Sequence, residues 1–231
     1  MSLISVIMSV HNGYHCVDAA IESILNQSHD NFEFLIMDDC SEDNTNKILY
    51  KYQKRDNRIK VFQNNKKLGL TKSLNILATK SNGKFIARQD ADDISFKNRL
   101  EIQYNFLKNS ENDACSTRAI TIQKPKKIPG ISYYLPFKLH IKIKNPVIHG
   151  SLMIKRQVFK DLGFYDENFY YSQDYKLVKD LIINNYKIKM INKVLYKLNT
   201  TNNISTNNAK EQKYFSDCVK KNKKPELKSS F

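Results

Sequence analysis

Leu-Ile-Ser-Val-Ile-Met-Ser-Val, residues 3–10, is a nearly continuous run of apolar and β-branched side chains. Such a run is typical of a strand buried on both faces of a parallel sheet. A short loop at residues 11–14 follows, and apolar residues then recur at helical spacing from Val17 to Leu25. The first 25 residues therefore predict a buried strand, a loop and an amphipathic helix.

The same alternation continues outward from this unit. Further apolar runs occupy residues 32–37, 59–62 and 84–89, and helical periodicity fills the intervals between them. Ser41 and Asp43 are placed to cap the helix that follows the second strand. Strands and helices that alternate with short links predict an α/β fold, a doubly wound and mostly parallel central sheet with helices on both faces.

Beyond a predicted helix at residues 97–107 the pattern weakens. Residues 116–146 contain several prolines and permit no assignment. We expect a strand at 147–154, a short helix at 158–162, and a helix that begins at Gln173.

Three carboxylates, Asp90, Asp92 and Asp93, directly follow the fourth apolar run. Clustered negative charge favours a cation, and Mg²⁺ commonly binds one or two carboxylates together with substrate phosphates. Ser9 and Asp39 follow neighbouring strands, whose carboxyl ends should meet at the same sheet edge. The bland alternative is a solvated loop that caps the next helix.

Composition limits the class of protein. The 231 residues are 41% hydrophobic, which suits one substantial core. No apolar stretch approaches the ~20 residues that span a bilayer, and residues 3–10 lack the features of a signal peptide, so a cytoplasmic location is expected. The four cysteines are scattered without a C-x-x-C pair, which predicts reduced thiols and neither a zinc site nor a disulfide framework.

The net charge of +15 is uneven. Residues 1–117 hold 15 basic and 15 acidic side chains, whereas residues 118–231 hold 23 basic and 8 acidic ones. Such an excess attracts polyanions, which include nucleic acid, anionic lipid and phosphorylated substrates. A lysine-rich composition that serves solubility alone is the simpler reading, and both stay open at this point.

Six segments, in this order, resemble the family 2 glycosyltransferases, which are nucleotide-sugar-dependent enzymes of the GT-A fold that act in polysaccharide biosynthesis. The resemblance extends over about residues 3–185, and the joint order is more specific than any single piece. The matching segments are Ser5–Gly13 (SVIMSVHNG), Met37–Thr45 (MDDCSEDNT), Asn65–Asn75 with Leu68-Gly69-Leu70, Asp90–Asp93 (DADD), His149–Ser151 (HGS) and Gln173–Tyr175 (QDY).

The resemblance implies a role for each matching position. Asp39 would contact the nucleobase, usually uracil, and the loop with Ser9, His11 and Asn12 would lie against base and ribose. The other implied roles are Gly69 in nucleotide binding, Asp90 at the ribose or donor sugar, Asp92 at a Mn²⁺ or Mg²⁺ ion, Asp174 as catalytic base, and His149, Gly150 and Ser151 beside donor sugar and acceptor.

Two departures from the family pattern are visible. Gln173 stands where the family usually has Glu, and the chain contains no tryptophan, so the Gln-x-x-Arg-Trp signature of processive synthases is missing. The resemblance thus implies a metal-dependent, inverting transferase that adds a single sugar to a growing glycan.

The resemblance also implies a domain plan. Residues 1–200 form one GT-A catalytic domain, in which about 1–115 bind the nucleotide sugar and about 116–200 bind the acceptor. Residues 201–231 are expected to be a basic, polar and partly disordered tail. The uneven charge suggests a lipid-diphosphate-linked or other anionic acceptor and a peripheral position at the inner membrane face.

Two other functions compete. A nucleotidyltransferase would use the same Asp-x-Asp metal site but release pyrophosphate instead of a nucleoside diphosphate. A nucleic-acid-binding protein would use the basic second half, although no zinc finger or RNA-recognition signature accompanies it. A dinucleotide-binding oxidoreductase is disfavoured, because the first loop contains one glycine, Gly13, and no G-x-G-x-x-G.

Overall fold

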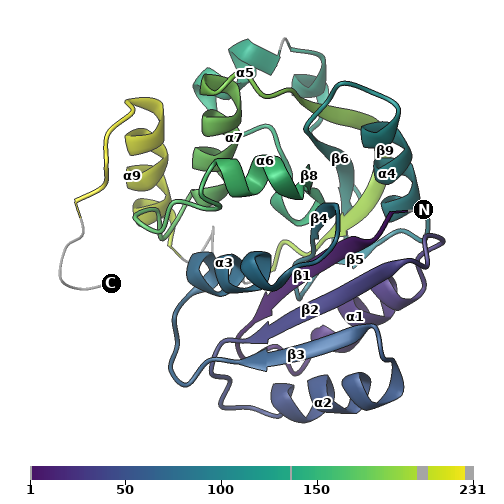
Figure 1. Cartoon of the computed structure of the whole chain (residues 1–231). Helices are drawn as coiled ribbons and strands as arrows, with labels where there is room; N and C mark the ends of the chain where they lie inside the picture. The colour runs from purple at the N-terminus through teal and green to yellow at the C-terminus, as the bar shows by residue number, and fades with distance from the viewer. Residues whose placement is uncertain (1, 136, 202–207, 227–231) are drawn as a thin grey trace.

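A computed structural model of the chain describes residues 2–135, 137–201 and 208–226. Within these described residues, nine strands form one curved sheet (Figure 1). They are β1 (Ile4–Val10), β2 (Phe32–Asp38), β3 (Ile59–Gln63), β4 (Phe85–Arg88), β5 (Ile94–Ser95), β6 (Ala114–Thr121), β7 (Lys127–Ile128), β8 (Met153–Lys155) and β9 (Ile188–Leu198).

The strand order is β3-β2-β1-β4-β8-β6-β9-β5, with β7 paired to β6. The first four strands of this order are parallel, as the apolar runs predict. The antiparallel strand β8 joins them to the second half, where β6 and β9 are again parallel to each other. The sheet is therefore continuous across both halves of the chain.

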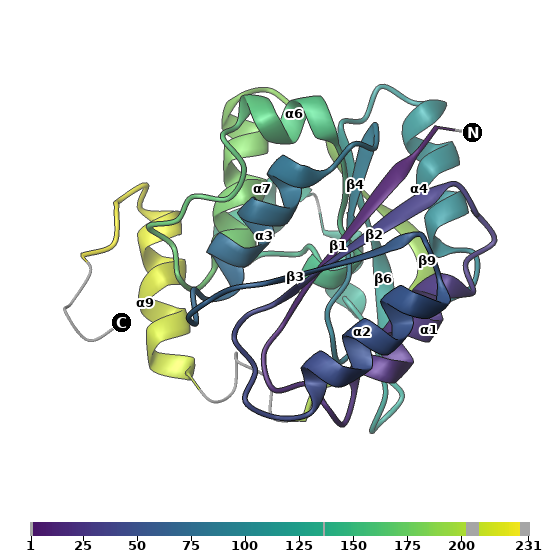
Figure 2. The ribbon, with the colours of Figure 1, turned by 60° about the horizontal axis from the view of Figure 1, so that its bottom comes forward.

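Helices cover both faces of this sheet (Figures 1 and 2). Side chains alternate along β1, so that Val6 and Met8 pack with one set of helices and Ile7 packs with the other. The first set is α1 (Val17–Leu25), α2 (Thr45–Arg55) and α4 (Arg99–Lys108); the second is α3 (Leu70–Lys80), α6 (Arg156–Asp161) and α7 (Gln173–Ile183). The predicted doubly wound arrangement is confirmed.

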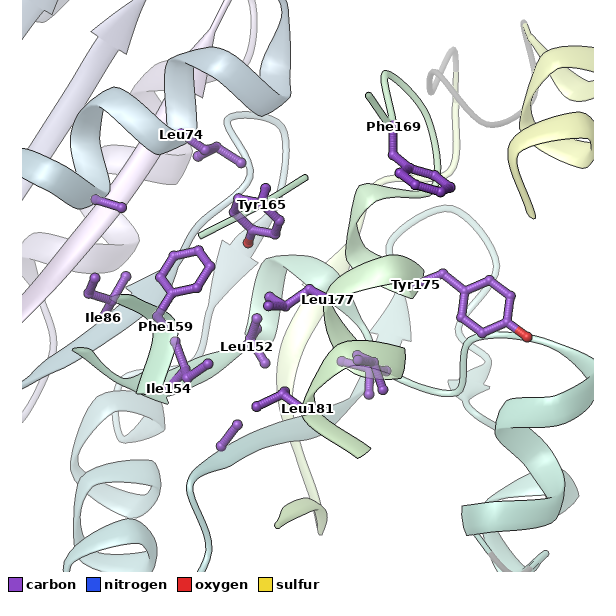
Figure 3. Packing of buried hydrophobic residues seen from close by; sticks show 14 of the residues in the cluster. Leu74, Ile86, Leu152, Ile154, Phe159, Tyr165, Phe169, Tyr175, Leu177 and Leu181 are labelled. Atoms are coloured by element: carbon purple, nitrogen blue, oxygen red, sulfur yellow. The ribbon is translucent and has the colours of Figure 1, made fainter. Parts of the chain in front are cut away.

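The larger core cluster joins the two halves of the chain (Figure 3). Leu74 of α3 and Ile86 of β4 pack in the same cluster as Phe159 of α6 and Leu177 and Leu181 of α7. Each of these five side chains is at most 2% exposed. The acceptor half predicted from the sequence is thus built onto the nucleotide half through one shared core.

The predicted strand at residues 147–154 is wrong in its first part. Residues His149–Ser151 form a 3₁₀ turn, η2, and only β8 at residues 153–155 is extended. The Ser151 hydroxyl donates to the Ile148 carbonyl (3.0 Å), a local bond that competes with strand pairing. The apolar neighbours of this turn make the whole segment resemble a buried strand in the sequence.

The prediction of a partly disordered polar tail is also wrong for residues 209–220. They form helix α9 (Ala209–Lys220), which packs against α7 (Figure 1). Phe215, Cys218 and Val219 are buried in the larger core cluster, at helical spacing i, i+3, i+4. This apolar stripe is short and lysines surround it, so the segment as a whole is polar. The rest of the predicted tail includes residues 202–207 and 227–231, which lie outside the described residues.

Several elements were not predicted at all. The proline-rich segment contains β6, β7, the 3₁₀ turn η1 (Ile131–Tyr134) and helix α5 (Phe137–Ile143), and β9 follows α7. Within the described ranges, no helix is long and apolar enough to cross a membrane.

Candidate functional site

The carboxyl ends of β2 and β4 lie on either side of the end of β1, since β1 pairs in parallel with both. Val10 is opposite Asp38, and Ile7 is opposite Arg88. The loops after these strands therefore share one edge of the sheet, where ligands bind in open α/β folds. We call the five carboxylates of this edge, Asp38, Asp39, Asp90, Asp92 and Asp93, the carboxylate edge.

Asp39 is buried and fixes the loop that precedes α3. One carboxylate oxygen accepts hydrogen bonds from Asn64 Nδ2 (2.7 Å) and the Leu68 amide (2.8 Å), and the other accepts one from the Gly69 amide (2.8 Å). Gly69 has φ +86°, a conformation that disfavours other residues. Asp39 and Gly69 are thus in contact, and nucleotide binding by this pair stays a prediction.

The loop after β1 lies beside Asp39. His11 Nδ1 is 3.0 Å from the Asp39 carbonyl oxygen, and the Asn12 amide donates to Ser41 Oγ (2.9 Å). Ser41 is therefore engaged with this loop instead of capping α2, whereas Asp43 does accept the Thr45 amide (2.9 Å) at the helix start. Ser9 is half-buried near the end of β1. These residues form one contiguous surface next to the carboxylate edge.

Asp92 and Asp93 occupy a region where negative charge is unfavourable. Burial, followed by the charge of Asp90, raises the pKa of Asp92 to about 6. Burial, with Asp90 and Asp92, raises the pKa of Asp93 to about 8, although its carboxylate accepts the Asn199 amide (2.7 Å). Burial and the nearby Asp92 carboxylate also raise the pKa of the Cys16 thiol to about 11, which places the loop after β1 close to Asp92.

Two buried arginines under this loop were missed in the sequence. The Arg88 guanidinium pairs with Asp90, and Arg99 Nη1 donates to the Arg88 carbonyl (2.9 Å) and the Gly150 carbonyl (3.1 Å). Burial lowers the pKa of Arg99 to about 10. An arginine inside a buried apolar run was the available signal, because arginine is rarely buried without a partner.

The turn with His149 and Gly150 lies directly against Asp90. A Cβ atom on Gly150 would be 2.6 Å from Asp90 Oδ2 and would also clash with the Tyr196 hydroxyl, which accepts the Asp90 amide (3.0 Å). His149 Nε2 is 2.7 Å from the Tyr165 hydroxyl. Burial, followed by the positive charge of Arg88, lowers the pKa of His149. His149 is therefore neutral at pH 7.

Ser151 differs from its two neighbours. Its hydroxyl is fully buried, accepts the Thr117 amide (3.1 Å) and donates to the Ile148 carbonyl. These bonds hold the turn in place. The predicted contact of Ser151 with donor or acceptor stays a prediction, and the geometry gives this residue a structural task.

Asp174 lies in the first turn of α7, where a helix dipole favours negative charge. Its Oδ2 accepts a hydrogen bond from Asn145 Nδ2 (2.6 Å). The charges of Asp174 and Asp90 both act on His149, so the turn at 149–151 lies near both of these carboxylates. Asn145 was not predicted, because its segment permitted no assignment.

No group of three or more His, Cys, Asp or Glu side chains in the described parts of the chain could hold a metal ion by itself. A site that uses one or two carboxylates together with phosphate oxygens needs no such group. Asp92 fits that pattern, because burial and the nearby charge of Asp90 raise its pKa, and a divalent cation would offset both effects.

Comparisons with known proteins agree with this geometry. Residues 5–163 match the family model described as glycosyl transferase family 2. An uncharacterized glycosyltransferase of Methanocaldococcus jannaschii is 33% identical over 229 residues, which cover 93% of this chain and 77% of that protein. The UDP-Glc:alpha-D-GlcNAc-diphosphoundecaprenol beta-1,3-glucosyltransferase WfgD of Escherichia coli is 38% identical over 109 residues, 47% of this chain and 42% of that protein.

A solved structure shows the same fold. S. aureus TarS 1-349 in complex with UDP-GlcNAc has a TM-score of 0.76 at 21% identity, over 90% of this chain and 61% of that chain. This chain therefore spans less than two thirds of TarS and of WfgD. The family model and the M. jannaschii relative cover most of the chain, so it belongs to glycosyltransferase family 2 and has the GT-A fold.

Proposed function

We propose that this chain transfers one sugar from a UDP-sugar to a hydroxyl group of a growing glycan, with inversion and with Mn²⁺ or Mg²⁺ as cofactor. The observation that carries the proposal is the position of Asp92 after the end of β4, where it is half-buried and close to Asp90; burial, followed by the charge of Asp90, raises its pKa. Functional sites are where such shifts concentrate.

Asp92 would hold the metal together with the donor diphosphate, and Asp90 would approach the ribose or donor sugar. When bound there, a divalent cation supplies positive charge against the charge that grows on the departing diphosphate. The buried Arg88 forms an ion pair with Asp90, which would keep the Asp90 carboxylate in one orientation beside the donor.

The donor nucleotide would lie along the loops that Asp39 ties together. The Asp39 carboxylate fixes Gly69, and His11 Nδ1 is 3.0 Å from the Asp39 carbonyl oxygen, so this one residue contacts both walls of the proposed nucleotide site. A uridine donor is supported by the relative WfgD, whose name gives UDP-Glc as its donor. Ser9 and Asn12 complete this wall.

Asp174 would take the proton from the acceptor hydroxyl. Asn145 donates to Oδ2 and so orients the carboxylate, while Oδ1 makes no hydrogen bond with the described residues and is available to a substrate. General bases of this kind typically contribute ~10²–10⁴-fold to a rate. Attack from the Asp174 side, opposite the diphosphate, would invert the anomeric centre.

The acceptor is proposed to be anionic and linked to a lipid diphosphate, with the enzyme bound peripherally at the inner membrane face. The acceptor in the name of WfgD is a diphosphoundecaprenol-linked sugar, and residues 118–231 hold the whole basic excess of this chain. Anionic substrates and surfaces are what such a charge attracts.

The proposal is tested with a panel of nucleotide sugars, each with Mn²⁺ or with EDTA. Release of a nucleoside diphosphate is measured for the wild type and for Asp92→Asn. We expect Mn²⁺-dependent release of UDP, lowered ~10³-fold in the variant, since loss of electrostatic stabilisation of a leaving group has effects of that size. Release of pyrophosphate would point to a nucleotidyltransferase instead.

Binding is measured separately. UDP should raise the melting temperature more with Mn²⁺ than with EDTA, and Asp92→Asn should remove most of that difference. Asp30→Asn, at an exposed position outside the site, is the matched control. An unchanged metal effect in Asp92→Asn would place the metal elsewhere.

A further inference from the structure

A pocket of about 320 Å³ lies between the β7 region and the segment that follows α5. This volume is within the range of small-ligand sites, which is ~300–1,000 Å³. It is distinct from the carboxylate edge, because none of the five carboxylates lines it. Its lining comes from residues 126–130, Ser132, His140 and residues 144–148.

The lining is basic and contains no acidic side chain. Lys126, Lys127 and Lys144 are exposed, and none of the three forms an ion pair with any residue that the structure describes. We call this cavity the basic pocket. Three unpaired ammonium groups around one cavity favour an anionic ligand.

His140 adds a buried imidazole nitrogen to the same pocket. Its side chain is 3% exposed, and Nε2 has no hydrogen-bond partner among the described residues. A buried polar atom without a partner is costly and uncommon in folded proteins. A ligand oxygen at this position would satisfy it.

The basic pocket adjoins the proposed base. Asn145 lines the pocket and donates to Asp174 Oδ2 at 2.6 Å. Ile148 also lines it and directly precedes His149, which lies beside Asp90 through Gly150. A ligand held in the pocket would therefore be next to the carboxylate that accepts the proton.

Exposed apolar side chains lie along the same segment. Tyr134 is 73% exposed, Leu139 56% and Ile143 63%, and Leu135 is exposed as well. We call these four residues the apolar patch. Leu139 and Ile143 are one turn apart on α5, while His140 and Ile141 of the same helix are buried, so α5 turns an apolar face outward beside the lysines. Apolar side chains that alternate with lysines favour a lipid over a nucleic acid.

We propose that the basic pocket binds the diphosphate of a lipid-linked acceptor and that the apolar patch contacts its lipid chain. This inference rests on the proposed function and assigns the acceptor site within it. The diphosphate lies against Lys126, Lys127, Lys144 and His140, and the attached sugar extends past Asn145 toward Asp174. The basic pocket then binds the diphosphate, and the apolar patch contacts the lipid chain of the same acceptor.

The test is flotation with three kinds of phosphatidylcholine vesicle: without additions, with a polyprenyl diphosphate, and with phosphatidylglycerol at equal surface charge. We expect binding at least ~10-fold tighter to the polyprenyl diphosphate vesicles than to the phosphatidylglycerol vesicles, since each lysine near an anionic group contributes up to about fivefold. Inorganic pyrophosphate should displace the protein from the former. Equal binding to both anionic vesicles, or no displacement by pyrophosphate, would overturn the assignment.

Matched variants locate the binding. Lys126→Ser, Lys127→Ser and Lys144→Ser together should remove the preference, whereas Lys210→Ser, Lys213→Ser and Lys224→Ser, which remove the same charge from positions on and after α9, should keep it. Ile143→Ser should weaken binding several-fold, and Ile183→Ser, at a similarly exposed isoleucine of α7, should not. The assignment fails if both lysine triples lose the preference equally.

The rise in melting temperature that UDP and Mn²⁺ cause tests the donor function separately from the acceptor site. A pocket variant that keeps this shift is folded and retains its donor site, so its loss of vesicle preference reports on the pocket. If the wild type shows the shift but no vesicle preference, the acceptor site is wrong and the proposed donor function stands. If it shows the preference but no shift, the pocket stands and the donor function fails.

Discussion

The carboxylate edge and the basic pocket have opposite charge, and the segment of residues 144–151 adjoins both of them. The first concentrates five carboxylates at the ends of parallel strands, with raised pKa values at Asp92 and Asp93. The second has three lysines and His140 with no acidic neighbour in its lining. This contrast shows that the net charge of the chain describes neither region, because acidic and basic side chains are gathered in different places.

Two contacts connect these regions to their surroundings. Gly150 touches Asp90 on one side, and Asn145 bonds to Asp174 on the other. A change at either contact should therefore affect one region and spare the other. Substitutions at Asp174, Gly150 and Asp92 test that separation.

The largest effect is expected at Asp174. Asp174→Asn keeps the size and much of the helix-start geometry but removes the basic carboxylate. Transfer to acceptor should fall by ~10²-fold or more, and the thermal shift by UDP and Mn²⁺ should not change. Asp180→Asn on the same helix, which breaks only the ion pair with Lys176 (2.6 Å), is the control. Normal transfer in Asp174→Asn would refute the role of base, and a lowered melting temperature alone would favour a helix-start role.

A smaller effect is expected at Gly150. Gly150→Ala places a methyl group against Asp90 and Tyr196, and such overpacking typically costs ~1–3 kcal/mol. The melting temperature should fall by a few degrees, and the shift by UDP and Mn²⁺ should shrink, because Asp90 must move. Gly163→Ala meets nothing within 4 Å and adds only the strain of φ +74°, so it should leave the nucleotide shift intact. Equal nucleotide shifts in both variants would mean that the turn and Asp90 are independent.

The smallest effect is the pH dependence of stability without metal. The pKa of Asp92 rises from its ordinary value of 3.8 to about 6 on folding, so between these values the folded state binds more protons than the unfolded state. The contribution of Asp92 to stability therefore falls as pH rises through that window. In EDTA, the melting temperature of Asp92→Asn relative to the wild type should rise between pH 4 and pH 7. A flat difference would show that Asp92 is not destabilised by its surroundings.

At pH 7, saturating Mn²⁺ should raise the melting temperature of the wild type above that of Asp92→Asn. The wild type gains a ligand that binds only the folded state, and the variant does not. Calorimetry of both proteins in the same buffers, with and without Mn²⁺, measures the two effects together. Asp30→Asn again controls for the substitution itself.

The parallel strands were predictable, because a strand that is buried on both faces requires a nearly continuous apolar run, as residues 3–10 and 32–37 have. The sheet edge followed from the same runs, since polar residues after parallel strands must meet there. Asp39 and Asp90 accordingly follow β2 and β4 at the same edge, and Gly150 lies against Asp90. Their individual chemical roles rest on resemblance and stay predictions.

The structure of the second half was harder to predict from its sequence, for physical reasons. Its strands pair in mixed directions, and β9 alternates apolar and lysine residues because one face is exposed. Helix α9 buries a narrow stripe of three residues among many polar ones, which leaves little periodic signal. The basic pocket is lined by residues near 126 and by residues near 144, which come together around β7 and α5. No spacing in the sequence predicts that these two segments are neighbours.

The pairing of Arg88 with Asp90 bears on attempts to redesign the sugar specificity of this protein. Replacing Asp90 would leave an arginine that is 2% exposed without its carboxylate, and breaking a buried pair in this way typically costs ~3–5 kcal/mol. Libraries that vary Asp90 alone would thus lose most members to misfolding before any donor is tried. Varying Asp90 together with Arg88, or starting from the exposed loop around Asn12, would change the proposed donor site and keep the fold intact.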